Sequence, residues 1–210
     1  FGGEVITHAR DPQVLTAKFD KTELKKRLGL AEDVFLIGHL GSYRPHKGLD
    51  RIVEAQDILN DDNIYFLYSA NHDVLPKRKN IIRINEFPMN ILPDILGACD
   101  LAVFPLLDND ISRYQFPAKI VDAMMLGIPF LVSNTEAIGE QLTPPEYLID
   151  INITAAELAQ RIKFVKEQKS LYSELADEMQ NKAIAEYSVS FCANKLKDIL
   201  NLMIDDKELS

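Results

Sequence analysis

Residues that build disulfide scaffolds and metal centres are scarce in this chain. Its 210 residues include no tryptophan, two cysteines and four histidines. Cys99 and Cys192 each lie among apolar neighbours, which predicts buried free thiols and a reducing compartment. The histidines are scattered along the chain without the spacing of metal ligands. We therefore expect no metal ion and no cofactor.

Long apolar runs are also missing. A run such as AMMLGIPFLV (123–132) is far shorter than the roughly 20 residues that a membrane-spanning helix needs. The first residues, FGGEVITHARD, lack the basic-then-apolar order of a cleavable signal peptide and do not begin with methionine, as in a piece of a longer protein. We expect a cytoplasmic location and leave open a place at the cytoplasmic face of a membrane.

Positive charge is in short supply. The chain has 23 lysines and arginines against 32 aspartates and glutamates, for a net charge of −9 at pH 7. This balance argues against a general surface for nucleic acid or anionic membrane, so no nucleic-acid partner is expected. It leaves room for one small phosphate site, because such a site needs only a few local cations.

Apolar strands alternate with helical patterns over most of the chain. Strands are expected at 34–40, 63–70, 80–85, 100–107, 129–132 and 146–151, after a short entry strand within 3–12. Helices are expected at 23–28 (capped by Thr22), 48–59, 91–98, 117–126, 134–140, 170–186 and 188–204. A further helix is expected to begin at a capping box formed by Thr154 and Glu157. The pattern predicts an α/β fold: a Rossmann-like doubly wound parallel sheet of about six strands, with helices on both faces and a C-terminal helical tail.

Ligands of such sheets bind at the carboxyl ends of the strands, which directs attention to the loop GSYRPHKG (41–48). Gly41 lets a ligand approach the backbone, and the helix that follows offers free N–H groups. Arg44, His46 and Lys47 add side-chain donors, so the loop is a candidate diphosphate site. A polar surface turn is the alternative.

The stretch FPAKIVDAMMLGIPFLVS (116–133) is typical of a helix, a stop and a strand. Lys119 and Asp122 lie one helical turn apart, so one can neutralise a phosphate while the other accepts hydrogen bonds from a ribose. An ordinary surface ion pair is the alternative. The turn Asn85–Pro88 is a weaker candidate for a base, and His39, inside an apolar strand, is predicted to be a satisfied core residue.

Taken together and in this order, these stretches resemble the C-terminal, donor-binding domain of the GT-B-fold retaining glycosyltransferases of family 4, also called group 1. The stretches that carry the resemblance, which covers roughly residues 5 to 150, are ITHARDP (6–12), GSYRPHKGLDRIVEA (41–55), NEFPMNILPDILGACDLAVFPL (85–106) and FPAKIVDAMMLGIPFLVSNTEAIGE (116–140). The resemblance implies a nucleotide-sugar donor and transfer of the sugar to an acceptor hydroxyl with retention of configuration.

The resemblance also implies a division of the chain. Residues 1–153 would form the domain that binds the donor, and the helices of 154–210 would pack on it or on a missing N-terminal domain. That missing domain would hold the acceptor, a glycan or lipid-linked sugar, and any peripheral membrane contact, so the isolated chain would be inactive. A non-catalytic nucleotide-binding or interaction domain, or half of a sugar-nucleotide epimerase, remains an alternative.

Site residues follow from the matched positions. The resemblance and the loop chemistry together assign the donor diphosphate to Gly41, Ser42, Arg44, Lys47 and Lys119, the ribose to Asp122, the sugar-facing loop to Tyr114, Gln115, Phe116, Pro117 and Ala118, and the base to Asn85, Phe87 and Pro88. Three positions depart from the family pattern. Ser42 stands where an arginine is expected, Tyr114 where the first acid is expected, and Pro117 where a glycine is expected. The sugar, the base, the acceptor and the oligomeric state are not determined by the sequence.

Overall fold

The computed structural model of the chain describes residues 8–41, 44–69, 79–84, 87–142 and 144–208. Within them, a six-stranded sheet comprises β1 (Phe35–His39), β2 (Ile64–Ser69), β3 (Ile81–Ile84), β4 (Leu101–Phe104), β5 (Phe130–Ser133) and β6 (Leu148–Ile149). The strand order is β3-β2-β1-β4-β5-β6, and all neighbouring pairs are parallel. The prediction of a Rossmann-like doubly wound sheet is confirmed. The order reverses between β1 and β4, which are neighbours in the sheet.

The central strands are buried on both sides, as their apolar sequences predict. Every residue of β1, β4 and β5 is buried. The expected strands 100–107 and 146–151 were too long: β4 ends at Phe104, and β6 covers two residues. Pro105 has no N–H to donate to a neighbouring strand, and Pro144 and Pro145 lead into a short turn, η3 (Pro145–Tyr147), just before β6.

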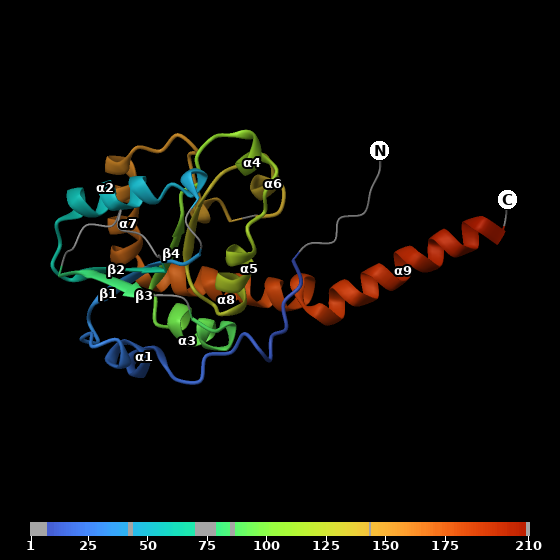
Figure 1. The fold of residues 1–210 in the computed structure, drawn as a ribbon, viewed down its shortest axis with the longest axis horizontal. Helices are drawn as coiled ribbons and strands as arrows, with labels where there is room; N and C mark the ends of the chain where they lie inside the picture. The colour runs from blue at the N-terminus through green and yellow to red at the C-terminus, as the bar shows by residue number, and fades with distance from the viewer. Residues whose placement is uncertain (1–7, 42–43, 70–78, 85–86, 143, 209–210) are drawn as a thin grey trace.

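Helices cover both faces of the sheet (Figure 1). Their bounds are α1 (Lys21–Arg27), α2 (Leu49–Leu59), α3 (Leu92–Gly97), α4 (Asp110–Arg113), α5 (Ala118–Met125), α6 (Glu136–Gly139), α7 (Ala155–Glu167), α8 (Lys169–Tyr187) and α9 (Val189–Glu208), with the short turns η1 (Pro45–Lys47) and η2 (Met89–Ile91). α2 packs against α7, whereas α1 packs against α3 and α5 against α8. α9 extends beyond the body formed by the sheet and these helices (Figure 1).

Local sequence explains most of the helix ends. The capping box is confirmed, because the Thr154 and Glu157 side chains satisfy each other's backbone N–H groups. The predicted cap of α1 was wrong: Asp20, not Thr22, accepts from the N–H of Glu23. α4 was not predicted, although Asn109 caps it through the N–H groups of Ile111 and Ser112. A helix of one turn carries too little periodicity to stand out from a polar loop.

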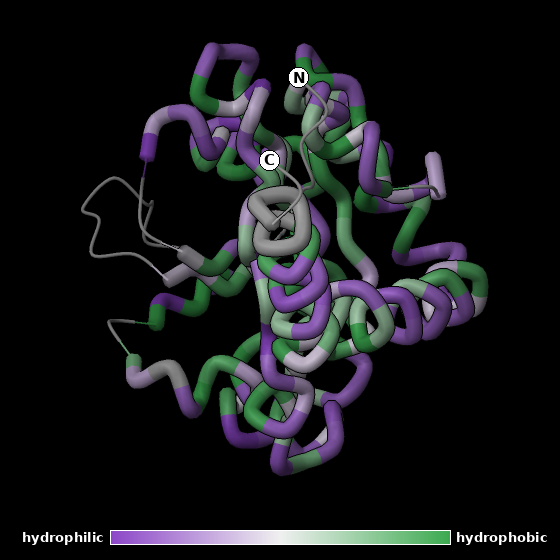
Figure 2. Tube along the Cα trace, turned by 90° about the vertical axis from the view of Figure 1, so that its right-hand side faces the viewer, coloured by the Kyte–Doolittle hydropathy of each residue, from purple (hydrophilic) through white to green (hydrophobic). Residues whose placement is uncertain are grey.

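Hydrophobic residues fill the space between these layers. In Figure 2, where hydropathy colours the chain, hydrophilic and hydrophobic residues alternate along the turns of the helices. The aromatic rings of Phe130 and Tyr147 stack with their centroids 4.3 Å apart, and Tyr147 meets Tyr172 of α8 edge-on. Cys99 and Cys192 are buried and free, as predicted.

One close approach sets the spacing of the loops after β1 and β4. Gly48 has φ +66°, and a methyl group at its Cα would overlap the carbonyl oxygen of Pro105. Only glycine fits here, because any side chain would push the two loops apart.

We expect Gly48→Ala to lower the free energy of unfolding by roughly 3 kcal/mol, since it adds a steric clash to the strain of a left-handed residue. Gly29→Ala is the matched control: Gly29 has φ +74°, but a methyl group on its Cα would meet nothing within 4 Å, so only about 1 kcal/mol of strain is expected there. Urea unfolding of both variants measures the difference. Equal losses would show that the contact with Pro105 has no role in stability.

Candidate functional site

The loops that follow β1 and β4 meet at the carboxyl edge of the sheet, where the strand order reverses. Besides the contact at Gly48, the N–H of Leu107 donates to the carbonyl oxygen of His46 over 2.8 Å. Open α/β sheets bind their ligands in the crevice at such a reversal. The two regions that the sequence singled out, 41–48 and 116–122, are therefore brought to one side of the molecule.

Two serines that the sequence analysis missed hold these loops in place. The Ser69 hydroxyl, at the end of β2, accepts from the N–H of Gly41 over 2.6 Å and lies 3.2 Å from its carbonyl oxygen. The buried Ser133 hydroxyl, at the end of β5, donates to the carbonyl oxygen of Leu106 over 2.9 Å. Each serine is the last residue of its strand and fastens the loop of the neighbouring strand. The signal in the sequence that could have indicated this role was a serine at the end of an apolar strand.

Three cations from the two regions share this edge. The Lys47 ammonium lies close above Gly41, 3.4 Å from where a methyl group on that glycine would sit. Partial burial lowers the pKa of Lys47, and the charges of Arg44 and Lys119 lower it further. The pKa of His46 is lowered by burial and by the charges of Lys47 and Arg44 in the same loop. Mutual repulsion of this kind marks a place where an anion would be stabilised.

Asp122 lies on α5 with no exposed surface, and both its carboxylate oxygens are engaged. Oδ1 accepts from Arg10 Nε over 2.5 Å, and Oδ2 accepts from Lys119 Nζ over 3.0 Å. The predicted pair of Lys119 and Asp122 is thus present, but it is buried at the carboxylate and includes a third member. Arg10 was not among the predicted site residues, because it lies 112 positions away in the sequence.

The sugar-facing stretch divides into buried and exposed residues. The ring of Phe116 is buried against Tyr187, with the ring centroids 6.0 Å apart and the planes at 16°. Pro117, predicted to be the first helical residue, is instead the N-cap of α5, and the helix begins one residue later, at Ala118. Tyr114, at the position of the expected first acid, is 72% exposed, and Gln115 beside it is exposed.

The predicted base-binding turn is only partly described. Asn85 lies outside the described residues, as does Ser42 of the diphosphate loop. Phe87 is half-buried against the core, and Pro88 is exposed, with its carbonyl oxygen accepting from the N–H of Ile91.

His39, at the end of β1, is a core residue, as predicted. Its Nδ1 lies 2.8 Å from the carbonyl oxygen of Val103 on β4, so Nδ1–H donates and Nε2 carries the lone pair. Burial lowers its pKa to about 4, against the smaller raising effect of the Val103 hydrogen bond and with a further lowering by Lys47. The imidazole is therefore neutral near pH 7 and does not add to the cations of the site.

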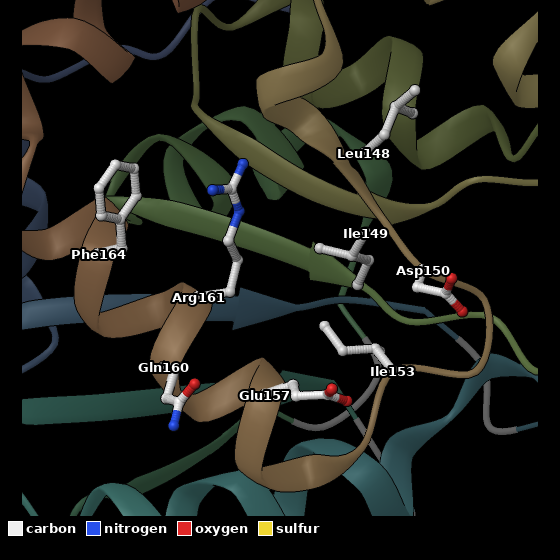
Figure 3. A pocket seen from close by; sticks show the side chains of 8 residues that line it. All are labelled: Leu148, Ile149, Asp150, Ile153, Glu157, Gln160, Arg161 and Phe164. Carbon is white, nitrogen blue, oxygen red and sulfur yellow. The ribbon is translucent and has the colours of Figure 1, made fainter.

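A separate cleft lies along the edge strand β6 and the adjoining face of α7 (Figure 3). Its volume is about 620 Å³, and it is lined by Leu148, Ile149, Asp150, Ile153, Glu157, Gln160, Arg161 and Phe164. Arg161 donates to the carbonyl oxygen of Glu146, and Glu157 is engaged in the capping box. None of the predicted site residues lines this cleft, which is shallow and open to solvent.

The described residues contain no group of three or more His, Cys, Asp and Glu side chains placed to hold a metal ion. In the same part of the chain, no helix combines the length and the apolar character that crossing a membrane requires.

Comparison with known proteins finds one matching family model and relatives that cover most of this chain. The family model described as "Glycosyl transferases group 1" matches residues 20–186. The chain is 24% identical over 177 residues to the putative teichuronic acid biosynthesis glycosyltransferase TuaC of Bacillus subtilis (strain 168), covering 84% of this chain and 44% of TuaC. It thus spans less than half the length of this curated relative.

Among solved structures, Anabaena HepE in complex with UDP is similar with a TM-score of 0.79 and 19% identity, over 94% of this chain and 57% of that one. The C-terminal domain of the group 1 family protein LpcC from Francisella tularensis is similar with a TM-score of 0.68 and 16% identity, over 86% of this chain and 100% of that one. At these identities the likeness shows the shared fold.

The lowered pKa of His39 predicts a pH dependence of stability. The unfolded chain takes up a proton near pH 6.5 and the folded chain only near pH 4, so stability is full above pH 6.5 and falls as the pH drops through this window. Between pH 7 and pH 5, we expect His39 to account for a loss of about 2 kcal/mol.

Urea unfolding of wild type and His39→Asn at both pH values isolates this contribution. Asparagine keeps a donor toward Val103 but does not titrate, so the variant should lose less stability than wild type between pH 7 and pH 5. Parallel losses in the two proteins would contradict the assignment of a buried, neutral His39.

Proposed function

Because this chain belongs to the glycosyl transferases group 1 family, we propose that it is the donor-binding half of a retaining glycosyltransferase, with a nucleoside-diphosphate sugar as its substrate. The observation that carries this proposal is the gathering of Arg44, Lys47 and Lys119 where the strand order reverses, on a chain with a net charge of −9. The complex of the similarly folded HepE with UDP supports the choice of ligand.

The diphosphate of the donor would lie against the 41–48 loop. Gly41 leaves the backbone open to close approach, and the Lys47 ammonium above it supplies a charged donor. Hydrogen bonds to charged groups contribute about 1.5–3 kcal/mol each, so two or three of them fix a diphosphate. The same cations stabilise the negative charge that develops on the leaving nucleoside diphosphate when the bond to the sugar breaks.

Asp122 would hold the ribose, and this requires a change of partners. Asp122 has no exposed surface, so a ribose hydroxyl can reach Oδ2 only after Lys119, which donates to this oxygen, has moved aside. A lysine ammonium is a compact point charge on a flexible stem, suited to such an exchange. We propose that Lys119 leaves the carboxylate and pairs with a phosphate of the donor. Binding of the diphosphate would then uncover Oδ2 of Asp122 for the ribose.

Transfer itself would need residues beyond this chain. The chain spans 44% of its relative TuaC, and the proposed acceptor site lies in a further domain of the full-length protein. We propose that the acceptor is a hydroxyl of a glycan or lipid-linked sugar, that the transferred sugar is a hexose, and that these residues alone transfer none. The reducing cytoplasm, at or away from its membrane face, is the proposed location, in keeping with the two free buried thiols.

A nucleotide-binding domain without transfer activity is the second candidate. Its supporting observation is Tyr114, which stands exposed at the position where the family pattern expects the first acid. Sugar transfer by the full-length protein would exclude this candidate.

The proposed function predicts measurable nucleotide binding by this chain. Calorimetric titration with UDP and GDP should show binding of at least one, and Lys47→Ala should raise its Kd by at least about tenfold through loss of a charged contact to the diphosphate. Lys163→Ala is the matched control, since this exposed lysine lies on α7 away from the site and should bind like wild type. The proposal fails if wild type binds neither nucleotide or if Lys47→Ala binds as tightly as wild type.

A further inference from the structure

Arg10 is fastened through both its backbone and its side chain. Its N–H donates to the carbonyl oxygen of Tyr187 over 2.8 Å, and its carbonyl oxygen accepts from the N–H of Val189 over 2.9 Å. These two bonds form a parallel bridge to Ser188, and they are all that the described residues contain of the expected entry strand. From this position its side chain reaches Asp122 Oδ1 on α5.

The residues that hold Arg10 form the junction between α8 and α9. Ser188 has extended backbone angles, φ −70° and ψ 151°, so one helix stops and the next begins there. Just before it, Tyr187 stacks on Phe116, which precedes α5. One end of α5 and the helix junction are therefore packed together, and Arg10 is bonded to the junction and to Asp122 within α5.

α8 also holds the far end of α5. Gln180 Nε2 donates to the carbonyl oxygen of Met125 over 2.8 Å. Asp122 thus lies on a helix whose two ends are fixed against α8, and its carboxylate has a defined direction.

The two partners of Asp122 differ in how they are held. Arg10 has a planar guanidinium and a backbone bonded on both sides, whereas Lys119 reaches the carboxylate at the end of a flexible stem from one turn away on the same helix. A buried carboxylate that loses every partner is strongly destabilised. When Lys119 leaves, Arg10 is the cation that stays paired with Asp122 and holds it in place.

We propose that Arg10 is a positioning residue for the donor nucleotide. It fixes Oδ1 of Asp122 so that Oδ2 is presented to a ribose hydroxyl once Lys119 has moved to the diphosphate, and it joins this carboxylate to the α8–α9 junction. The inference rests on the proposed function, because it assigns a further residue to the same nucleotide site.

The test compares a nucleoside diphosphate with its 2′,3′-dideoxy analogue, which lacks the hydroxyls that Asp122 would bind. For wild type, we expect UDP, or GDP if that is the nucleotide bound, to bind about tenfold more tightly than its dideoxy analogue. Arg10→Gln should bring this ratio close to one while affecting the dideoxy analogue little. A merely structural role of Arg10 would instead weaken both ligands by the same factor.

Three variants serve as controls. Arg27→Gln removes an exposed arginine that pairs with Glu23 on the surface and should keep the wild-type ratio. Asp122→Asn should lower the ratio as Arg10→Gln does, and Lys47→Ala should weaken both ligands equally, because both carry the diphosphate. If Arg10→Gln fails to fold, Arg10→Lys keeps the charge without the planar fork and should fold with an intermediate ratio.

The possible failures are distinguishable. Absence of nucleotide binding by wild type would overturn the proposed function and this inference with it. A wild-type ratio near one would overturn the ribose role of Asp122 and hence that of Arg10. A ratio that falls in Asp122→Asn but stays at the wild-type value in Arg10→Gln or Arg10→Lys would overturn this inference alone.

Discussion

The carboxylate of Asp122 is buried without any exposed surface, and a buried charge is stable only beside opposite charges. One of its partners, Lys119, comes from the same helix, and the other, Arg10, comes from the N-terminal segment. The backbone of Arg10 is also bonded to Tyr187 and Val189, so the residue that neutralises this carboxylate is tied to the junction between α8 and α9. A single electrostatic need thereby connects α5, α8, α9 and the N-terminal segment.

The neighbouring loop brings positive charges together. Burial lowers the pKa of Lys47, and the nearby charges of Arg44 and Lys119 lower it further, although the chain as a whole is acidic. Cations gathered in this way would stabilise an anion bound between them. The Asp122 carboxylate neutralises one of these cations, Lys119, and this ion pair links the proposed ribose and phosphate sites.

Precise loop positions support this arrangement. The contact of Gly48 with Pro105 leaves no room for a side chain, and the hydroxyls of Ser69 and Ser133 fasten one loop each. These contacts fix the backbone from which the lysine and arginine side chains extend, as packing and hydrogen bonds around a functional site commonly do.

The amino-acid sequence by itself determined the layers of this protein. Apolar runs such as 35–39 and 130–133 specify buried parallel strands, and local signals such as the Thr154 capping box specify where helices begin, because these patterns depend on residues a few positions apart. The same locality brought the 41–48 loop and the Lys119–Asp122 pair to attention. Only the tertiary structure decided that Asp122 is buried, that Phe116 packs on Tyr187, and that Arg10 completes the ion pairs. These contacts join residues 71 and 112 positions apart, and no periodicity or spacing encodes a contact of that kind.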